Sequence, residues 1–216
     1  MWQRLVSLWK GNRSFIVFVV LLLAFRSVIA DWNVVPTGSM KPTILEGDRI
    51  LVNKMAYDLR LPFTHISLLK HGDPARGEIV IFDSEAADMR MVKRVVGLPG
   101  DWIAMHDNRL WINGRQIGYS DAERAAAWQD RIENLDGVEH WVRWLDEESG
   151  LSGFPPVKVP DGHYLVLGDN RDNSADSRVI GFVPRQEIVG RARYVLLSLN
   201  HENHYMPRPH RFMHRL

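Results

Sequence analysis

The short segment around Ser39 contains the first residue of this sequence whose surroundings suit covalent chemistry. Residues 36–43 read PTGSMKPT. Gly38 allows a backbone bend that a side chain would hinder, and Pro36 and Pro42 each fix φ, so we expect the Ser39 hydroxyl to be held on a stiff loop. A hydroxyl held in this way is a candidate nucleophile, although an ordinary proline-bounded turn favours the same residue types.

A serine nucleophile needs a base, and the usual base is a histidine oriented by a carboxylate. Several histidines follow the N-terminal apolar run, and none sits in a recognisable triad motif such as G-x-S-x-G. These candidate bases are His65, His71, His106, His140 and His163.

A lysine in the segment MRMVKRVVG, residues 89–97, is the other candidate base. If this segment is a β-strand, its period of two places Lys93 on one face with Met89, Met91 and Val95. Apolar surroundings disfavour the charged ammonium and lower the pKa of a lysine, as a neutral general base requires. A strand lysine that reaches the surface is the commoner alternative.

A polar loop, GDNRDNSADSR at residues 168–178, follows a predicted strand. Its Asp, Asn and Ser content is typical of a loop whose side chains cap backbone groups, and Asp176 and Arg178 could pair. A calcium loop is the rival interpretation. The EF-hand spacing is not met, because no Glu follows at the required distance and no flanking helices are predicted.

From Val34 onward, short β-branched or aliphatic runs alternate with Gly, Pro, Asp and Asn, which predicts a mainly β fold. Asn113-Gly114 predicts a tight hairpin turn, because both central residues of a type I′ turn need positive φ. The predicted strands are 49–54, 78–82, 89–97, 102–106, 109–112, 137–145, 163–168 and 192–199.

One region breaks the β pattern. Ser120 and Glu123 have the spacing of a capping box, which predicts a helix over DAERAAAWQDRI, residues 121–132. Because this helix lies between predicted strands, we expect a small inserted subdomain at 107–160. The segment FPPVKVP, residues 154–160, is then the return linker.

The N-terminal run FIVFVVLLLAF has no polar residue. Extended to residues 14–30, it reaches the short end of the roughly 17–25 residues that span a bilayer, and it predicts a transmembrane helix. Basic residues precede it and Asp31 follows it, so the positive-inside rule places the N-terminus in the cytoplasm and the rest of the chain outside. A cleaved signal peptide is the alternative, but Arg26 would place a charge between its apolar core and its cleavage site.

The composition limits the partners of the chain. With 27 basic and 26 acidic residues in 216, the net charge is +1, so we expect no nucleic-acid partner. The absence of cysteine excludes disulfides, thiolate metal sites and a cysteine nucleophile. The histidine-rich end, residues 201–216, lacks a carboxylate cluster at ligand spacing, so we expect a solvated tail and neither a metal nor a cofactor.

Together, these segments resemble the type I signal peptidases, membrane-anchored serine proteases that use a serine and lysine dyad. PTGSMKPT matches the serine box of the family, GDRILVNK the next box, KRVVGLPGD the lysine box and GDNRDNSADSR the last box, in family order. The resemblance is specific over 34–54, 78–103 and 163–198. It implies a largely antiparallel β catalytic domain with a smaller subdomain, in agreement with the predicted strands.

The resemblance also implies roles for single residues. Ser39 would be the nucleophile and Lys93 the general base. The backbone N–H of Ser39 and the hydroxyl of Thr37, where many relatives carry serine, would form the oxyanion hole. Ser174 would orient Lys93 by a hydrogen bond. The residues implied to be structural are Arg94, Asp176 and Arg178. The residues implied to bind substrate are Val35, Pro36, Met40, Ile44 and Val92.

The predicted organisation follows from the anchor and the resemblance. Well-studied relatives have two membrane segments whereas this chain shows one, so the topology rests on the charges that flank it. The predicted parts are a cytoplasmic N-terminus at 1–13, an anchor at 14–30, a catalytic β core at 31–106 and 161–200, an inserted subdomain at 107–160 and a tail at 201–216.

The implied activity is removal of signal peptides from exported preproteins by cleavage after a small-x-small motif such as Ala-x-Ala. The expected partners are those signal peptides and the lipid bilayer. The expected location is the bacterial inner membrane, with a single pass and the catalytic domain on the periplasmic side. Two alternatives remain: a Ser/Lys protease with another task, such as a self-cleaving repressor or a maturation protease, and a non-catalytic tethered β-domain that binds extended peptides.

Overall fold

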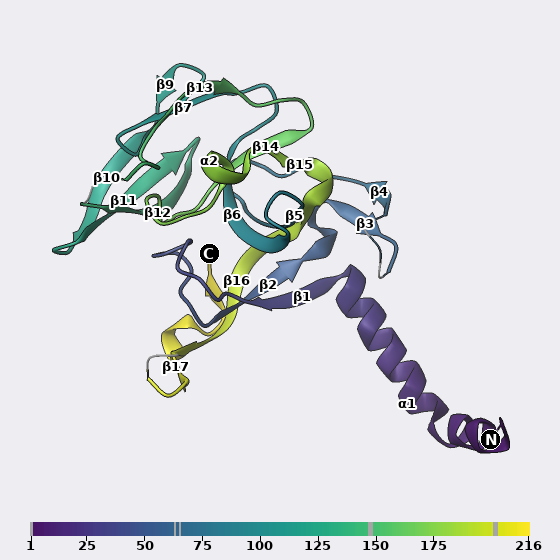
Figure 1. The fold of residues 1–216 in the computed structure, drawn as a ribbon. Coiled ribbons are helices and arrows are strands. Elements are labelled where there is room, and N and C mark those ends of the chain that lie inside the picture. The colour runs from purple at the N-terminus through teal and green to yellow at the C-terminus, as the bar shows by residue number, and fades with distance from the viewer. Residues whose placement is uncertain (1, 63, 65, 147–148, 201–202) are drawn as a thin grey trace.

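The computed structural model describes residues 2–62, 64, 66–146, 149–200 and 203–216, with side chains described for 12–23 and, within those ranges, from 26 onward. A long N-terminal helix leads into a body made almost entirely of antiparallel strands (Figure 1). The mainly β fold predicted from the sequence is therefore confirmed.

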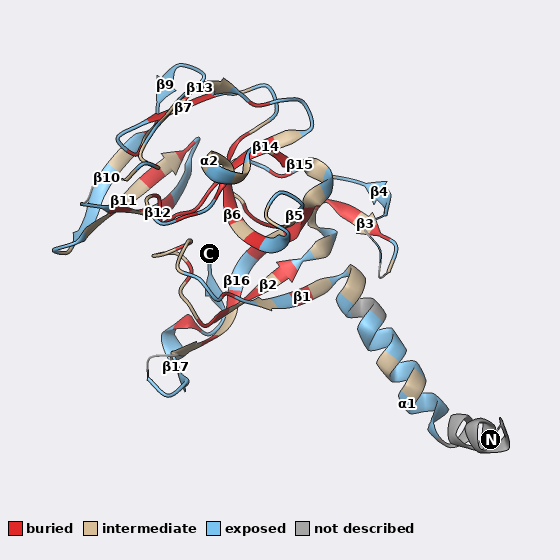
Figure 2. Ribbon diagram, in the orientation of Figure 1, coloured by how far each residue is buried: buried red, intermediate tan, exposed pale blue. Residues whose placement is uncertain are grey.

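Helix α1 spans Trp2–Val28 and projects away from the β body (Figure 1), with most of its described side chains exposed (Figure 2). At its end, Arg26 Nε donates to Asp31 Oδ1 at 2.7 Å, and the guanidinium lies 4.4 Å from the centre of the Trp32 ring. Within the described part of the chain, no helix is long and apolar enough to cross a membrane. The anchor over 14–30 stays a prediction.

The main sheet has the strand order β1-β2-β16-β5-β6-β14-β15, and two short C-terminal strands also pair with β16. Val80 on β5 lies opposite Lys93 on β6, and Ile79 lies opposite Arg94. The bounds are β1 Ala30–Val34, β2 Asp48–Asn53, β5 Ile79–Ser84, β6 Met89–Gly97, β14 His163–Leu167, β15 Val183–Pro184, β16 Ile188–Asn200, β17 Met206–Pro207 and β18 His214–Arg215.

Two smaller sheets lie beyond the main sheet, on the side away from α1 (Figure 1). The four-stranded sheet has the order β13-β7-β8-β9, with β13 Phe154–Lys158, β7 Trp102–His106, β8 Arg109–Ile112 and β9 Arg115–Gln116. The three-stranded sheet is β10-β11-β12, with β10 Gly118–Arg124, β11 Trp128–Leu135 and β12 Val138–Leu145. The remaining elements are β3 Asp58–Arg60, β4 Ser67–Lys70, α2 Ser177–Ile180, η1 Lys54–Ala56, η2 Arg185–Glu187 and η3 Pro209–Arg211.

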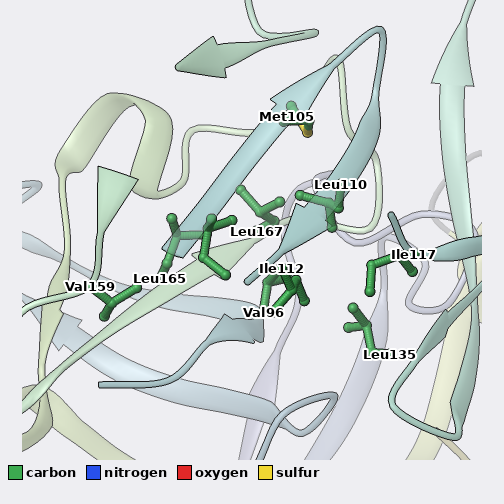
Figure 3. Close-up of a cluster of buried hydrophobic side chains, with 10 residues drawn as sticks. Val96, Met105, Leu110, Ile112, Ile117, Leu135, Val159, Leu165 and Leu167 are labelled. Carbon is green, nitrogen blue, oxygen red and sulfur yellow. The ribbon is translucent and has the colours of Figure 1, made fainter. Parts of the chain in front are cut away.

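Three hydrophobic clusters form the core. In β5, Ile79 and Ile81 belong to one cluster while Val80 and Phe82 belong to another, so both faces of this strand are buried (Figure 2). This explains why the strand is a continuous apolar run rather than an alternating one. The third cluster lies beneath β7 and β8 and includes Leu110 (Figure 3).

The helix predicted over 121–132 is wrong. These residues belong to the hairpin of β10 and β11, in which Ser120 lies opposite Ile132. The four alanines favour a helix locally, but β11 also pairs along its whole length with β12 and buries Glu133 and Leu135. Tertiary pairing therefore overrides a modest local propensity.

The return linker predicted at 154–160 is also wrong over most of its length, because Phe154–Lys158 forms β13 and pairs with β7. The predicted boundary at residue 107 falls inside the hairpin of β7 and β8, where His106 lies opposite Arg109. The turn at Asn113-Gly114 is confirmed, with φ of 52° and 79°. The division of the chain into a core and an inserted subdomain stays a prediction.

The solvated tail predicted at 201–216 is wrong for its described part from residue 206 onward. Strands β17 and β18 both pair with β16. Arg211 is 7% exposed and forms an ion pair with Asp48, and Leu216 packs against the cluster that contains Ile79. A buried counter-charge and strand pairing hold this segment, and neither is visible in the local composition.

Candidate active site

The side chains of Ser39 and Lys93 meet in the structure. Lys93 Nζ donates a hydrogen bond to Ser39 Oγ at 2.8 Å and a second to the carbonyl of Val92 at 3.0 Å. At the first distance, the hydroxyl of Ser39 could equally donate to a neutral amine. The contact therefore has the geometry of a nucleophile and its base.

Lys93 is almost completely buried, with 4% of its surface exposed. Burial lowers the pKa of Lys93 from 10.5 to about 8, against the opposing charges of Asp176 and Asp169. Its strand neighbours Met91 and Val95 are buried as predicted. The carboxylates of Asp169 and Asp176 belong to the polar loop 168–178. The period of the strand could not predict that these charges lie near Lys93. A large fraction of the amine is thus neutral near pH 8.

Two side chains of the Ser39 loop approach Gly38 closely. A Cβ on Gly38 would lie 2.8 Å from Glu46 Oε1 and 3.2 Å from Lys41 Cδ, and these two side chains form an ion pair. The φ angle of Gly38 is not positive. A side chain at this position would therefore displace the partly exposed side chains of Lys41 and Glu46, whereas the backbone conformation itself would tolerate it.

The polar loop 168–178 surrounds the base with fixed charges. Asp176 is fully buried, caps α2, and binds Arg178 through Nε at 2.8 Å and Nη2 at 2.6 Å. This confirms the predicted pair. Asp169 is bound in the same bidentate way by Arg94, the neighbour of Lys93. Burial opposes the charged carboxylate of Asp169, yet Arg94 holds its pKa below the ordinary value.

A groove of about 580 Å³ opens beside Ser39 and Lys93. One wall is Trp32–Met40, the other is Met89–Lys93, and Asn173 and Ala175 close it. The backbone N–H of Ser39 donates no hydrogen bond to any described residue, and Thr37 is exposed in the same wall. Both are therefore free to interact with a molecule in the groove.

The chain matches the family model described as signal peptidase, peptidase S26, over residues 8–197. The chain belongs to the signal peptidase family. It is 38% identical over 205 residues to a signal peptidase I of Pseudomonas fluorescens, a match that covers 87% of this chain and 72% of the relative.

Two other matches extend this comparison. A signal peptidase I of Bacillus licheniformis is 33% identical over 198 residues, covering 90% of this chain and 91% of the relative. A solved signal peptidase I from Enterococcus faecalis V583 is 29% identical and covers 56% of this chain and 97% of its own, with a TM-score of 0.37, too low to support an argument about the fold. The sequence relatives and the family model show that this protein is a serine peptidase that removes signal peptides.

The structure of this signal peptidase places most of the predicted site residues around the groove, but not all of them. Val35, Pro36, Met40 and Val92 line it. Ile44 does not, because it is fully buried beneath the loop in the same cluster as Val35 and Met40.

Ser174 differs from its predicted role. It is 4% exposed, but its Oγ has no hydrogen-bond partner among the described residues, so the expected bond to Lys93 is not formed. The amine of Lys93 bonds instead to Ser39 and to the carbonyl of Val92. A role of Ser174 in orienting the base stays a prediction.

None of the described histidines forms a competing base in this signal peptidase. His106 is exposed beside Asp107, and His71 bonds to the carbonyl of Met55. Two other candidate bases are also placed: His140 is buried 3.2 Å from Glu133, and His163 lies beside Asp161. His65 lies outside the described residues. Of the described histidines, none makes a hydrogen bond to Ser39, and in the described ranges no three His, Asp or Glu side chains cluster as a metal site would require.

Several residues of the site were missed in the sequence. Trp32, Val34, Met89 and Met91 line the groove. The period of the strand places Met89 and Met91 on the face of Lys93, but it does not show that this face lines a groove. Asn170 was also missed, and it bonds directly to the loop of Ser39.

Proposed function

We propose that this signal peptidase cleaves exported preproteins after a small-x-small motif, with Ser39 as the nucleophile and Lys93 as the general base. The supporting observation is the 2.8 Å contact between Ser39 Oγ and an amine that is nearly completely buried. A buried lysine with a lowered pKa is neutral often enough to accept the serine proton. The histidines that the structure describes offer no comparable contact.

The proposed reaction has two stages. Neutral Lys93 takes the proton of Ser39 Oγ as that oxygen attacks the carbonyl carbon of the scissile peptide bond, and the carbonyl oxygen becomes an oxyanion. The Ser39 N–H and the Thr37 hydroxyl donate hydrogen bonds to this oxyanion. The C–N bond then breaks, and the leaving amine takes the proton from Lys93. In the second stage Lys93 activates a water, which hydrolyses the acyl-enzyme and releases Ser39.

The position of β6 supports an extended substrate. Strand β14 pairs with β6 only at Arg94, Val95 and Gly97, whereas β5 pairs with Met89–Arg94 on the opposite edge. One edge of Met89–Lys93 therefore lacks a strand partner in the described structure, and it forms a wall of the groove. A peptide that adds a strand there presents alternate side chains to the protein.

The apolar wall of the groove would contact every second side chain of the bound peptide. Val35 and Met40 are almost fully buried at the groove, as is Met91 across from them. Because these large side chains already fill the space beneath the groove, we infer that small residues fit best one and three positions before the cut. Val92 and Pro36 would contact the same part of the peptide, and Ile44 would support it from below.

The remaining predicted roles follow from the ion pairs. Arg94 would hold Asp169, and Arg178 would hold Asp176, so that two fixed charge pairs frame the base. Residues 14–30 would anchor the protein in the bacterial inner membrane by a single pass, with the N-terminus in the cytoplasm. Because Ser39 follows this segment closely in the chain, the active site would stand near the membrane surface, where a signal peptide also emerges.

A comparison of four proteins tests this proposal. A model preprotein is incubated in detergent with the wild type, Ser39→Ala, Lys93→Ala and the control Lys158→Ala, and the products are measured by mass spectrometry. Lys158 is an exposed strand lysine, so its loss leaves the rate unchanged. We expect one cut after a small-x-small motif, absent from the Ser39 and Lys93 variants.

The other outcomes separate the alternatives. Cleavage that survives Ser39→Ala overturns the nucleophile, and cleavage undiminished in Lys93→Ala overturns the base. A wild type that binds the preprotein without cutting it indicates a peptide-binding module. Cleavage only at an unrelated motif indicates a Ser/Lys protease with another task.

A further inference from the structure

Asn170 makes two hydrogen bonds to the loop that carries Ser39. Its side-chain Nδ2 donates to the carbonyl of Gly38 at 3.0 Å, and its backbone N–H donates to the carbonyl of Ser39, also at 3.0 Å. Asn170 is only 4% exposed. One buried residue thus holds two successive carbonyl groups at the candidate nucleophile.

The first of these bonds determines the direction of a different group. The carbonyl of Gly38 and the N–H of Ser39 belong to the same peptide unit, which is planar and trans. In such a unit the C=O and the N–H point in opposite directions. A donor that holds the Gly38 carbonyl on one side therefore directs the Ser39 N–H toward the other side.

The carbonyl and the N–H of this peptide unit differ in their hydrogen-bond partners. The Gly38 carbonyl accepts from Asn170 and also from the N–H of Lys41 at 3.1 Å. The Ser39 N–H has no partner in the described structure, and Ser39 lines the groove. A free backbone donor beside a nucleophile is the arrangement that stabilises an oxyanion.

Asn170 is itself held in place by strand β12. Arg143 on β12 donates its N–H to the carbonyl of Asp169 at 2.8 Å and accepts from the N–H of Arg171 at 2.9 Å, so Asn170 lies in a short parallel bridge. The side chain of Asp169 is bound by Arg94, next to Lys93 on β6. Two adjacent residues, Asp169 and Asn170, thus contact the strand of the base and the loop of the nucleophile.

We propose that Asn170 is a positioning residue for the oxyanion hole, whose side-chain amide holds the Gly38–Ser39 peptide so that the Ser39 N–H faces the groove. This inference rests on the proposed function, in which that N–H stabilises the oxyanion. Asn170 touches neither the substrate nor the reacting atoms, and it acts through the peptide unit alone. Its loss therefore weakens transition-state binding and leaves substrate binding intact.

Two variants and one control test the inference. Asn170→Asp keeps the shape but replaces the donor by a carboxylate that repels the Gly38 carbonyl, and Asn170→Ala removes the donor without adding a charge. Asn203→Asp makes the same amide-to-carboxylate change at an exposed residue that does not line the groove. For each protein, rates are measured at a pH above which the rate no longer increases. This is needed because the new carboxylate could raise the pKa of Lys93.

We expect both Asn170 variants to lose about 10²-fold in kcat, the loss seen when one oxyanion donor is removed, with KM nearly unchanged. A peptide boronate, which forms a tetrahedral adduct with a serine, should lose affinity by a similar factor. An uncleavable peptide of the same sequence should bind as it does to the wild type. Asn203→Asp should match the wild type in all three measurements.

Several results would overturn the inference. If the wild type cleaves and Asn170→Ala keeps the same kcat, this inference is overturned while the proposed function stands. The same conclusion follows if the Asn170 variants lose boronate affinity and peptide affinity equally. Loss of the folded state in both variants, measured by circular dichroism, would assign Asn170 a structural role instead. A wild type that does not cleave would overturn the proposed function and this inference with it.

Discussion

Arg171 and Glu133 form an ion pair in which the two side chains are 1% and 0% exposed. Arg171 belongs to the polar loop 168–178, and Glu133 belongs to β11 of the three-stranded sheet. The guanidinium binds both carboxylate oxygens, at 2.9 and 2.5 Å, and the hydroxyl of Tyr119 also donates to Glu133. The ion pair thus links the three-stranded sheet to the polar loop 168–178, which contacts Ser39 through Asn170.

We predict that Glu133→Ala lowers the free energy of unfolding by about 3–5 kcal/mol, because it leaves the guanidinium of Arg171 buried without a counter-charge. Urea denaturation followed by fluorescence measures this loss. The control is Asp146→Ala, which removes the exposed partner of Arg124 and should change stability by less than about 1 kcal/mol. Equal effects of the two substitutions would contradict the prediction.

The pH dependence of cleavage should show the lowered pKa of Lys93. Its value of about 8 means that the neutral amine predominates above pH 8 and is lost as the pH falls below it. While chemistry limits the rate, kcat/KM should fall about tenfold for each pH unit below that pKa. Initial rates between pH 6 and pH 10 check this. A rate that is flat down to pH 6, or that still rises near pH 10, would contradict a lysine base with a pKa of about 8.

Gly168→Ala should lower the activity. A Cβ on Gly168 would lie 2.2 Å from Ser174 Oγ and 2.5 Å from the carbonyl oxygen of Ser39, so the nucleophile loop must move. A displacement of about 1 Å can cost about 10²-fold in rate. We expect kcat to fall by about that factor, measured with a fluorogenic signal-peptide substrate.

The matched control for this substitution is Gly118→Ala. A Cβ on Gly118 would meet nothing within 4 Å. Its kcat should stay close to that of the wild type. A kcat for Gly168→Ala that also stays within about twofold of the wild type would show that the loop has room that the structure does not indicate.

The C-terminal segment should be needed for a stable nucleophile loop. Arg211 binds Asp48 through Nε and Nη2 and donates to the carbonyl of Thr43, while Asp48 accepts from the N–H of Leu45. Arg211→Ala leaves Asp48 buried without a counter-charge, which should cost about 3–5 kcal/mol of the free energy of unfolding.

The exposed neighbour His210, in the same short helix η3, supplies the control. His210→Ala should leave the urea midpoint unchanged within error. If both variants unfolded at the midpoint of the wild type, the docked segment would contribute nothing to stability.

The sequence determined those features that depend on neighbours along the chain. The period of two in residues 89–97 predicted β6 to the residue, and the positive φ of Asn113 and Gly114 followed from the turn they form. The pair of Asp176 and Arg178 was predictable because the two residues lie two positions apart on one loop. The order and spacing of the motifs were enough to indicate the family.

Tertiary structure decided which of several local options the chain adopts. The alanine-rich segment at 121–132 favours a helix in isolation, but β11 has a strand partner on each side and becomes a strand. The residues 206–216 read as a polar tail, but Arg211 finds a buried carboxylate and docks. Pairing and burial involve residues distant in sequence, so composition alone could not predict either outcome.

The site itself depends on both levels. The sequence singled out Ser39 and Lys93 through a stiff loop and a strand period, but their 2.8 Å contact joins segments 54 positions apart. The low pKa of Lys93 depends on how deeply the folded chain buries it, and the direction of the Ser39 N–H depends on Asn170, which reaches Gly38 across 132 positions. Residue types and periodicity determine what each segment can do, whereas packing in three dimensions decides which segments meet and how their groups are oriented.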